Sequence, residues 1–600
     1  MGGIDISDCR FPSFGDPRCQ FLNQESIKSE GSFMSSEHHD QQQYYLANLQ
    51  KRVAAGHIDR RGFVQLATAI GIETALVATV VDHAIATSRN QEQSRQPIEA
   101  SYDYIVVGAG SAGCAIAARL SEDPSCRVLL IEAGGANIDR PALQSPVLWP
   151  SNFGTDVDWA YRTTPQARAA GREFNWPRGK VIGGSSSINA MIWVWGHPAD
   201  FDQWAYAGNQ GWDYGRLRSI FQKIETCARK SPNGNRGTNG PMHVEPIDNP
   251  HPLSAGFFTA CEEVGHQVLD DVGAPLRDGA GYMDFNTKDR QRFSVVHGYL
   301  LPALERKNLT LLTRARVDAL TFSQSRCTGI QLRIGAKRRQ VIAERETVVC
   351  AGAVESPRLL MLSGVGDAQE LRRHGIDVVT DLPGVGENLQ DHCFIVGFVA
   401  ETMEPLAPGS RAGSHLFFRS LQAAYSPDVH AVLATSAVGT NEVEPNKGFS
   451  IRLGLLRPTS RGQIKITSDD PNAPLVIDPK YLSAEADITR LCAAVEHSRD
   501  IGSAAGLSEW RKREIARIPG GKAELREFVA RNVGSYWHPV GTCAMGVHEQ
   551  AVVDPSLRVH GTANLRVADA SIMPTIPSGN TNAPTIAIAE RAAQMIGGSK

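Results

Sequence analysis

Residues 102–134 read Tyr-Asp-Tyr-Ile-Val-Val-Gly-Ala-Gly-Ser-Ala-Gly-Cys-Ala-Ile-Ala-Ala-Arg-Leu-Ser-Glu-Asp-Pro-Ser-Cys-Arg-Val-Leu-Leu-Ile-Glu-Ala-Gly. An apolar strand at 104–107 runs into a glycine-rich turn, a helix rich in small residues follows, and a second apolar strand at 128–131 ends at Glu132. This order predicts a βαβ unit that binds a dinucleotide.

Each motif residue has a physical reason to be there. Gly108 permits the tight strand-to-helix turn, Gly110 has no Cβ to block a pyrophosphate, and Gly113 lets the helix pack closely on the strand. The helix N-terminus, at Ser111, presents free N–H groups to the phosphates. Glu132 can accept hydrogen bonds from both ribose hydroxyls, which favours NAD or FAD over NADP.

Length and composition narrow the class of protein. A chain of 600 residues exceeds one ordinary core, so two interleaved domains are expected. The content is 42% hydrophobic and 21% charged, as in a globular protein, and a net charge of −3 gives no reason to expect nucleic acid as a partner. The eleven cysteines include no Cys-x-x-Cys pair, so buried free thiols are expected and no metal site is predicted.

Residues 1–100 are interpreted as an N-terminal extension. The polar stretch 1–50 is expected to be disordered, and 57–87 resembles a twin-arginine export signal with its pair Arg60-Arg61. A surface-packed helix is the alternative, because Glu73 interrupts the apolar run. Export and a cytoplasmic location both stay open, and no other stretch is apolar enough to span a bilayer stably.

Further signals follow the first unit. The loop 178–191 packs Gly183-Gly184 against three serines and can approach a flat ring or a phosphate closely. Strands are expected at 308–317, at 329–334 and at 347–350, before a helix with Pro357 at its start.

The stretch 391–531 has no glycine-rich signature. Strand-like pieces at 450–456 and 463–467, with helices at 484–500 and 522–532, predict an antiparallel sheet with helices on one face. This stretch is interpreted as the substrate-binding domain, and its contacts with a substrate cannot be assigned. Four residues here could line a substrate site, although core packing is the favoured explanation for all of them: Cys393, His415, Phe417 and Phe418.

The C-terminal part regains strong motifs. Residues 535–542 (Ser-Tyr-Trp-His-Pro-Val-Gly-Thr) precede a strand at 565–570 and the loop 577–584 (Pro-Ser-Gly-Asn-Thr-Asn-Ala-Pro). A helix is expected at 585–597, with its N-terminus facing whatever the loop cradles.

Four motifs in a fixed order make residues 102–600 resemble the glucose–methanol–choline (GMC) oxidoreductases. They are the nucleotide unit at 108–132, the Gly-Gly-Ser-Ser loop at 183–186, Gly-Ala-Val-Glu-Ser-Pro at 352–357 with Ser-Gly-Val-Gly at 363–366, and the pair formed by 538–542 and 580–584. Within the family, the C-terminal motifs look most like aryl-alcohol and hydroxymethylfurfural oxidases.

The resemblance implies an α/β protein with a Rossmann-like FAD-binding domain built from discontinuous segments, and an α+β substrate domain with an antiparallel sheet. The expected bounds are 101–390 with 532–600 for the first and 391–531 for the second. It also implies bound FAD and the oxidation of alcohols. Members with a covalent flavin carry a histidine where this chain has Ile188, so non-covalent FAD is expected.

By the same resemblance, Glu132 would hold the adenosine ribose and the backbone of Val317 the adenine edge. Asp569 and Ala570 would lie by the pyrophosphate and ribityl chain. The residues expected along the flavin are Gly184, Ser185, Asn189, Ala190, Met191, Trp537 and Thr581.

Oxidising an alcohol requires a base for the hydroxyl proton and an acceptor for the hydride. His538 matches the family's base, and the amide of Asn580 would bind the substrate oxygen. Asn582 is interpreted as a residue that fixes the loop backbone, and Trp537 as an aromatic pocket wall that favours aromatic or furanic primary alcohols.

Several readings of this site remain open. Oxygen is the expected acceptor, and a dehydrogenase that uses a quinone or another carrier is the first alternative. A hydroxynitrile lyase on the same scaffold is the second, and a light-driven fatty-acid decarboxylase is the third, against which His538 argues.

Overall fold

The structure, a computed structural model, describes residues 98–598 apart from short gaps at 230–233, 408–410, 423, 439–441, 445 and 516–517. The expected disordered stretch at 1–50 and the export signal or helix at 57–87 lie outside the described residues. Within the described part, no helix has both the length and the apolar character needed to cross a membrane.

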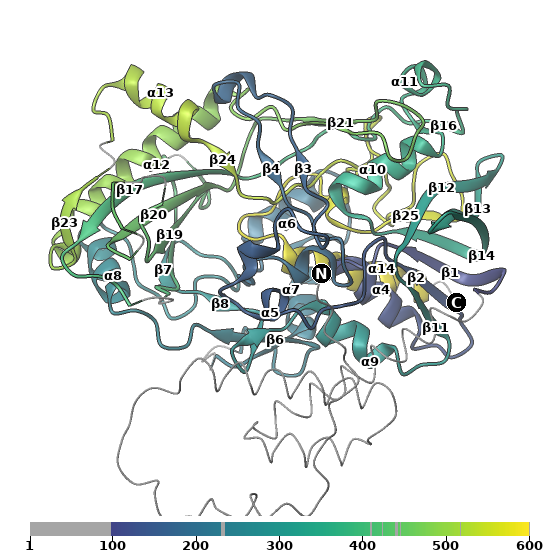
Figure 1. Cartoon of the computed structure of the whole chain (residues 1–600), viewed down its shortest axis with the longest axis horizontal. Helices are drawn as coiled ribbons and strands as arrows, with labels where there is room; N and C mark the ends of the chain where they lie inside the picture. The colour runs from purple at the N-terminus through teal and green to yellow at the C-terminus, as the bar shows by residue number, and fades with distance from the viewer. Residues whose placement is uncertain are drawn as a thin grey trace, which may run out of the picture. The chain divides into compact units, whose positions relative to one another are not determined.

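The motif at 102–134 forms the centre of a mixed sheet, drawn on the right of Figure 1. Strand β1 (Ser101–Val107) leads into helix α4 (Ser111–Leu120) and then into β2 (Val128–Ile131). Strands β1 and β2 pair in parallel, with Tyr104 opposite Val128. The βαβ unit predicted from the sequence is confirmed.

Segments from far along the chain complete this sheet, in the order β11-β2-β1-β14-β13-β12 with β25 beside β14. Strand β14 pairs in parallel with β1 and β25 and antiparallel with β13. The added strands are β11 (Leu309–Leu312), β12 (Ala315–Ser323), β13 (Arg326–Ile334), β14 (Lys337–Val349) and β25 (Leu565–Val567). The discontinuous Rossmann-like domain is thereby confirmed.

A second sheet, which is antiparallel, lies on the left of Figure 1 and has the strand order β23-β17-β20-β19-β18-β7 with β24 beside β17. Helix α12 packs on β17 and β20. Its strands are β7 (Gly279–Tyr282), β17 (Cys393–Thr402), β18 (Ser414–Phe418), β19 (Val429–Ala434), β20 (Gly448–Leu455), β23 (Arg511–Glu514) and β24 (Gly534–Ser535). Strands β7 and β24 come from outside 391–531, and the domain bounds given above remain a prediction.

Helices flank both sheets. The helices expected at 484–500 and 522–532 are present as α12 (Glu485–Ser503) and α13 (Lys522–Asn532). The others are α5 (Pro141–Gln144), α6 (Pro198–Tyr206), α7 (Tyr214–Ile224), α8 (Leu253–Glu263), α9 (Leu301–Ala303), α10 (Gly352–Leu362), α11 (Ala368–Arg373) and α14 (Asn582–Gly597).

Two helix starts differ from the sequence-based expectation. Helix α10 begins at Gly352, so Pro357 lies inside it and not at its start. A proline there leaves a carbonyl of the preceding turn without its N–H donor. The hydroxyl of Thr542 donates to the Ala353 carbonyl at 2.7 Å and so replaces that donor. Helix α14 begins at Asn582, three residues earlier than expected.

The nine described cysteines are all free thiols, and seven of them are buried, as the scattered spacing predicts.

The minor strands are β3 (Tyr161–Arg162), β4 (Asn175–Trp176), β5 (Glu225–Cys227), β6 (Met242–Pro246), β8 (Asp284–Phe285), β9 (Thr287–Lys288), β10 (Gln291–Arg292), β15 (Val365–Gly366), β16 (Thr380–Asp381), β21 (Gln463–Lys465) and β22 (Val476–Asp478).

Candidate active site

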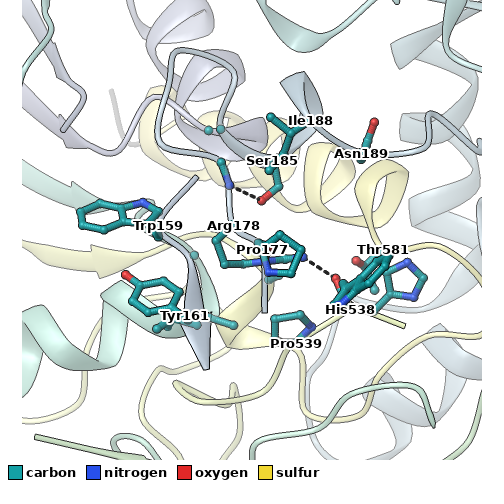
Figure 2. A pocket seen from close by; sticks show the side chains of 18 of the residues that line it. Trp159, Tyr161, Pro177, Arg178, Ser185, Ile188, Asn189, His538, Pro539 and Thr581 are labelled. Carbon is teal, nitrogen blue, oxygen red and sulfur yellow. Dashed lines mark hydrogen bonds between the residues drawn. The ribbon is translucent and has the colours of Figure 1, made fainter. Parts of the chain in front are cut away.

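One cavity of about 840 Å³ is lined by residues of both sheets. Every residue that the sequence predicts to be catalytic or to bind the cofactor lines it, except Gly113. Figure 2 shows Trp159 and Tyr161 at one end of this pocket and His538 and Thr581 at the other. The sequence analysis therefore placed its candidates around a common space.

The glycines of the first turn behave as the motif requires. Gly108 has φ +99°, a conformation that side chains other than glycine rarely adopt. A Cβ on Gly113 would lie 1.8 Å from the Gly108 carbonyl oxygen, so Gly113 permits the close packing of helix on strand. A Cβ on Gly110 would meet nothing nearer than the Gly184 Cα at 3.9 Å. Open space therefore lies in front of Gly110, where a pyrophosphate is expected.

Glu132 is buried at the end of β2 and lines the same cavity. Its carboxylate accepts hydrogen bonds from the backbone N–H of Ala109 at 3.1 Å and of Gly134 at 2.8 Å. Burial raises the pKa of Glu132 to about 7. The two hydroxyls of a bound ribose would donate hydrogen bonds to the Glu132 carboxylate and so replace the water that solvates an exposed carboxylate.

The N-termini of two helices meet at the phosphate end. The Ser111 hydroxyl at the start of α4 donates to Asn582 Oδ1 at the start of α14, at 2.8 Å. Asn582 thus links two helix starts, which differs from its expected role of fixing a loop backbone. Its Nδ2 is buried and has no hydrogen-bond partner among the described residues. Paired helix N-termini with a spare amide donor suit a pyrophosphate.

The serine-rich loop lies directly against the first turn. The Gly183 N–H donates to the Ala109 carbonyl at 2.7 Å, and the Gly179 N–H donates to Ser185 Oγ at 3.2 Å. Asn189 is fixed by Arg292, whose Nη1 donates to Asn189 Oδ1 at 2.7 Å. Arg292 is buried, and no local signal in the sequence identifies its role.

Asp569 lines the cavity, but its carboxylate is already bound within the protein. It accepts hydrogen bonds from the Gly352 N–H at 2.8 Å, from the Ser356 hydroxyl at 2.6 Å and from the Ser571 N–H at 2.8 Å. It therefore fixes the start of α10 against the segment 569–571. Ala570 and Val317 line the cavity beside it, and their contacts with FAD remain a prediction.

His538 and Asn580 form a pair inside the cavity. Asn580 Nδ2 lies 3.2 Å from His538 Nε2, and Asn580 Oδ1 has no hydrogen-bond partner within the described part of the chain. His538 Nδ1 lies 2.9 Å from His392 Nδ1. With a proton on Nδ1, His538 donates to His392, and its unprotonated Nε2 accepts from the Asn580 amide inside the cavity.

Burial, followed by the charges that His392 and Arg178 can carry, holds the pKa of His538 well below its usual value. His392 is itself kept neutral, because burial lowers its pKa to about 3. The carbonyls of Leu456 and Pro577 lie near the His392 ring, but outside hydrogen-bonding geometry with Nε2. His538 is thus an uncharged imidazole at neutral pH, the form that accepts a proton.

The backbone around His538 is fixed by Asp391, which the sequence analysis missed. Asp391 accepts hydrogen bonds from the His538 N–H at 2.6 Å, from the Ser535 hydroxyl at 2.5 Å and from the Tyr481 hydroxyl. Arg178 also holds this segment, because its Nη2 donates to the Trp537 carbonyl at 2.6 Å. These contacts hold the histidine's main chain independently of its ring.

Aromatic rings form one wall of the cavity. Trp537, held at φ +62°, packs edge-on against Phe153 with ring centroids 5.2 Å apart and against Trp149 at 6.2 Å. Phe394 on β17 lines the cavity from the antiparallel sheet. The favoured core-packing interpretation is confirmed for four residues, which are buried and do not line the cavity: Cys393, His415, Phe417 and Phe418.

These features fit a flavin dinucleotide. The space before Gly110, the buried carboxylate of Glu132 and the unpaired Asn582 amide suit an ADP moiety. A cavity that continues from there to His538 and Asn580 suits a flavin ring placed beside a base. The class of protein defined by this fold and site is a two-domain, FAD-dependent oxidoreductase.

Comparisons with known proteins identify the family. The N-terminal GMC oxidoreductase model matches residues 102–394, and the C-terminal GMC oxidoreductase model matches 458–589. The chain therefore belongs to the GMC oxidoreductase family. It is an FAD enzyme that acts on CH–OH donors.

Among curated relatives, a mitochondrial choline dehydrogenase of Homo sapiens is 37% identical over 568 residues, covering 88% of this chain and 94% of the relative. An alcohol dehydrogenase [acceptor] of Pseudomonas putida is 37% identical, covering 82% of this chain and 95% of the relative.

Among solved structures, pyridoxine 4-oxidase from Mesorbium loti superimposes with a TM-score of 0.79 at 37% identity, covering 82% of this chain and 99% of that one. A fungal aryl-alcohol oxidase superimposes with a TM-score of 0.74 at 24% identity, covering 83% and 99%. The second likeness concerns the fold alone.

Proposed function

We propose that this enzyme oxidises primary alcohols, preferably aromatic or furanic ones, to aldehydes, with oxygen as the electron acceptor. The observation that carries the proposal is the His538–Asn580 pair, 3.2 Å apart in a cavity shared with the nucleotide-binding residues. An uncharged base and an amide donor are the two groups that a bound hydroxymethyl group requires.

Asn580, His538 and His392 have separate roles in the proposed reaction. The Asn580 amide donates to the substrate oxygen and orients the carbinol carbon, and His538 Nε2 takes the hydroxyl proton. Bound FAD supplies the acceptor for the hydride that leaves the same carbon. His392 accepts from the Nδ1–H of His538 and so keeps Nε2 directed at the substrate.

The preference for aromatic alcohols rests on the cavity wall. Trp149, Phe153 and Trp537 give a rigid aromatic surface at which a flat ring gains apolar contact. A solved relative at 37% identity is named a pyridoxine oxidase, which also favours this class.

A carrier-dependent dehydrogenase is the second candidate. The relatives named choline dehydrogenase and alcohol dehydrogenase [acceptor] favour it, because their names do not specify oxygen. The name oxygen-dependent choline dehydrogenase, given to a relative from Brucella ovis, favours oxygen.

Anaerobic mixing of the holoenzyme with benzylic, furanic, aliphatic and sugar alcohols tests the proposal. We expect rapid bleaching of flavin absorbance by benzylic or furanic alcohols, and peroxide formation in proportion to aldehyde when air is admitted. Turnover only with an added dye would favour the dehydrogenase. Flavin that no alcohol bleaches would contradict alcohol oxidation altogether.

Non-covalent FAD gives a separate prediction. Ile188, at the position where a histidine would tether the flavin, lines the cavity and offers no nucleophile. We expect acid or heat denaturation, followed by centrifugation, to leave all the flavin absorbance in the supernatant as intact FAD. Yellow colour retained in the pellet after washing would refute this.

A further inference from the structure

Arg452 lies in the wall of the cavity, and the chemistry described above does not use it. It projects from β20 in the middle of the antiparallel sheet, opposite Val432 of β19, and both residues line the cavity. A cation in an otherwise apolar wall is costly unless something neutralises it.

The described residues of the protein leave this charge uncompensated. The only hydrogen bond of the guanidinium within the described residues runs from Nη2 to the Ser436 hydroxyl at 3.1 Å. Its Nε is buried without a partner, and no described carboxylate forms an ion pair with it. Burial consequently lowers the pKa of Arg452.

Among the described residues, the titratable group whose charge acts on Arg452 is Tyr536, and it carries no negative charge at neutral pH. Burial raises the pKa of Tyr536, whose hydroxyl contacts His430 Nδ1 at 3.2 Å, and burial keeps the pKa of His430 low. Arg178, a cation whose charge acts on His538, is compensated by protein groups. Two carbonyls accept its hydrogen bonds, and the carboxylates of Asp391 and Asp158 lie near it.

Arg452 lies within reach of a molecule bound at His538. A Cβ on Gly454 would lie 3.1 Å from the Tyr536 ring, and the Tyr536 and His538 ring centroids are 4.8 Å apart. Arg452 precedes Gly454 by two residues on β20, so the two lie on the same face of the strand at a spacing of about 7 Å. One substituted benzene ring can therefore span the distance from base to guanidinium.

We propose that Arg452 is a specificity-determining residue that binds a carboxylate on the substrate, so that the preferred substrates are primary alcohols carrying a carboxylate group. This deepens the proposed function and rests on it. A guanidinium pairs with a carboxylate through directed, charge-assisted hydrogen bonds, and its charge disfavours a cationic alcohol such as choline.

A matched pair of alcohols tests the inference. Para-hydroxymethylbenzoate and para-hydroxymethylbenzamide have nearly the same shape and differ in charge. With the holoenzyme in stopped flow, we expect the apparent dissociation constant to be about tenfold lower, or more, for the carboxylate, the scale of one charge-assisted hydrogen bond.

Three variants assign the effect to Arg452. In Arg452→Met the two alcohols should bind with about equal apparent dissociation constants. In Arg452→Lys part of the preference for the carboxylate should remain. Arg461→Met is the control, because this partly buried arginine is bound to the Pro458 and Ser460 carbonyls and does not line the cavity. A merely structural Arg452 would change stability or FAD content and leave the ratio of the two ligands unaltered.

A binding measurement separates this inference from the proposed function. Para-methylbenzoate and para-methylbenzamide cannot be oxidised as alcohols, and their binding to the holoenzyme can be followed by the perturbed flavin spectrum. Preferential binding of the benzoate that is lost in Arg452→Met supports the inference, even if no alcohol reduces the flavin. Equal affinity for the two ligands in the wild type would overturn it, even if benzylic alcohols are good substrates.

Discussion

Replacing His538 by alanine is expected to slow flavin reduction by an alcohol by about two to four orders of magnitude, the usual contribution of a general base. The ring is the base nearest to the Asn580 amide, and no second imidazole lines the cavity within the described part of the chain. FAD should stay bound, because Asp391 and Arg178 hold the neighbouring main chain through backbone groups that the substitution leaves intact.

The pH dependence gives a second readout of the same residue. The pKa of His538 is held well below its usual value of about 6.5, so the wild-type rate should stay on its plateau from pH 8 to below about pH 6.5. Protonation of His538 removes the base, so the rate must fall on the acid side. In His538→Ala this acid limb should disappear together with most of the rate.

Single-turnover reduction of the flavin under argon, measured at several pH values, checks both expectations. His374→Ala is a suitable control, because His374 contacts Glu370 on α11 and does not line the cavity. Alanine at 538 with more than about a tenth of the wild-type reduction rate would exclude His538 as the base.

Local patterns were sufficient wherever one continuous segment determines the structure. All the residues that define the βαβ unit lie in the single stretch 102–134, where strand, turn, helix and acidic residue follow one another. The amphipathic helices α12 and α13 were predicted to within a few residues for the same reason. Gly108 and Gly110 line the cavity together because they lie two residues apart in the same strand-to-helix turn.

Contacts between distant segments explain what was missed. Asp391 is 147 residues from the backbone N–H that it holds, and nothing beside it in the sequence points to His538. Arg452 belongs to a strand whose buried face is decided by the neighbouring strands β17 and β19, so its cavity-facing side could not be deduced. The start of α10 was misplaced because the donor that compensates for Pro357 comes from Thr542, far along the chain.

Gly110→Ala is expected to weaken FAD binding by about 10- to 100-fold while leaving the protein folded. Gly110 has φ −82°, which alanine adopts readily, and a Cβ there would meet no protein atom nearer than 3.9 Å. The added methyl group would instead enter the space before the α4 N-terminus. Losing one charge-assisted hydrogen bond to phosphate costs about 1.5–3 kcal/mol, which corresponds to this change in affinity.

The experiment separates ligand exclusion from damage to the fold. Titrating the FAD-free Gly110→Ala protein with FAD gives the dissociation constant. The thermal unfolding temperature of this variant without FAD should match that of the FAD-free wild type. Gly520→Ala is the control, because its Cβ would meet nothing within 4 Å. Gly113→Ala should instead unfold the domain, since its Cβ would lie 1.8 Å from the Gly108 carbonyl oxygen. Unchanged FAD affinity in Gly110→Ala would mean that the phosphates do not approach this turn, because a close approach leaves no room for a methyl group.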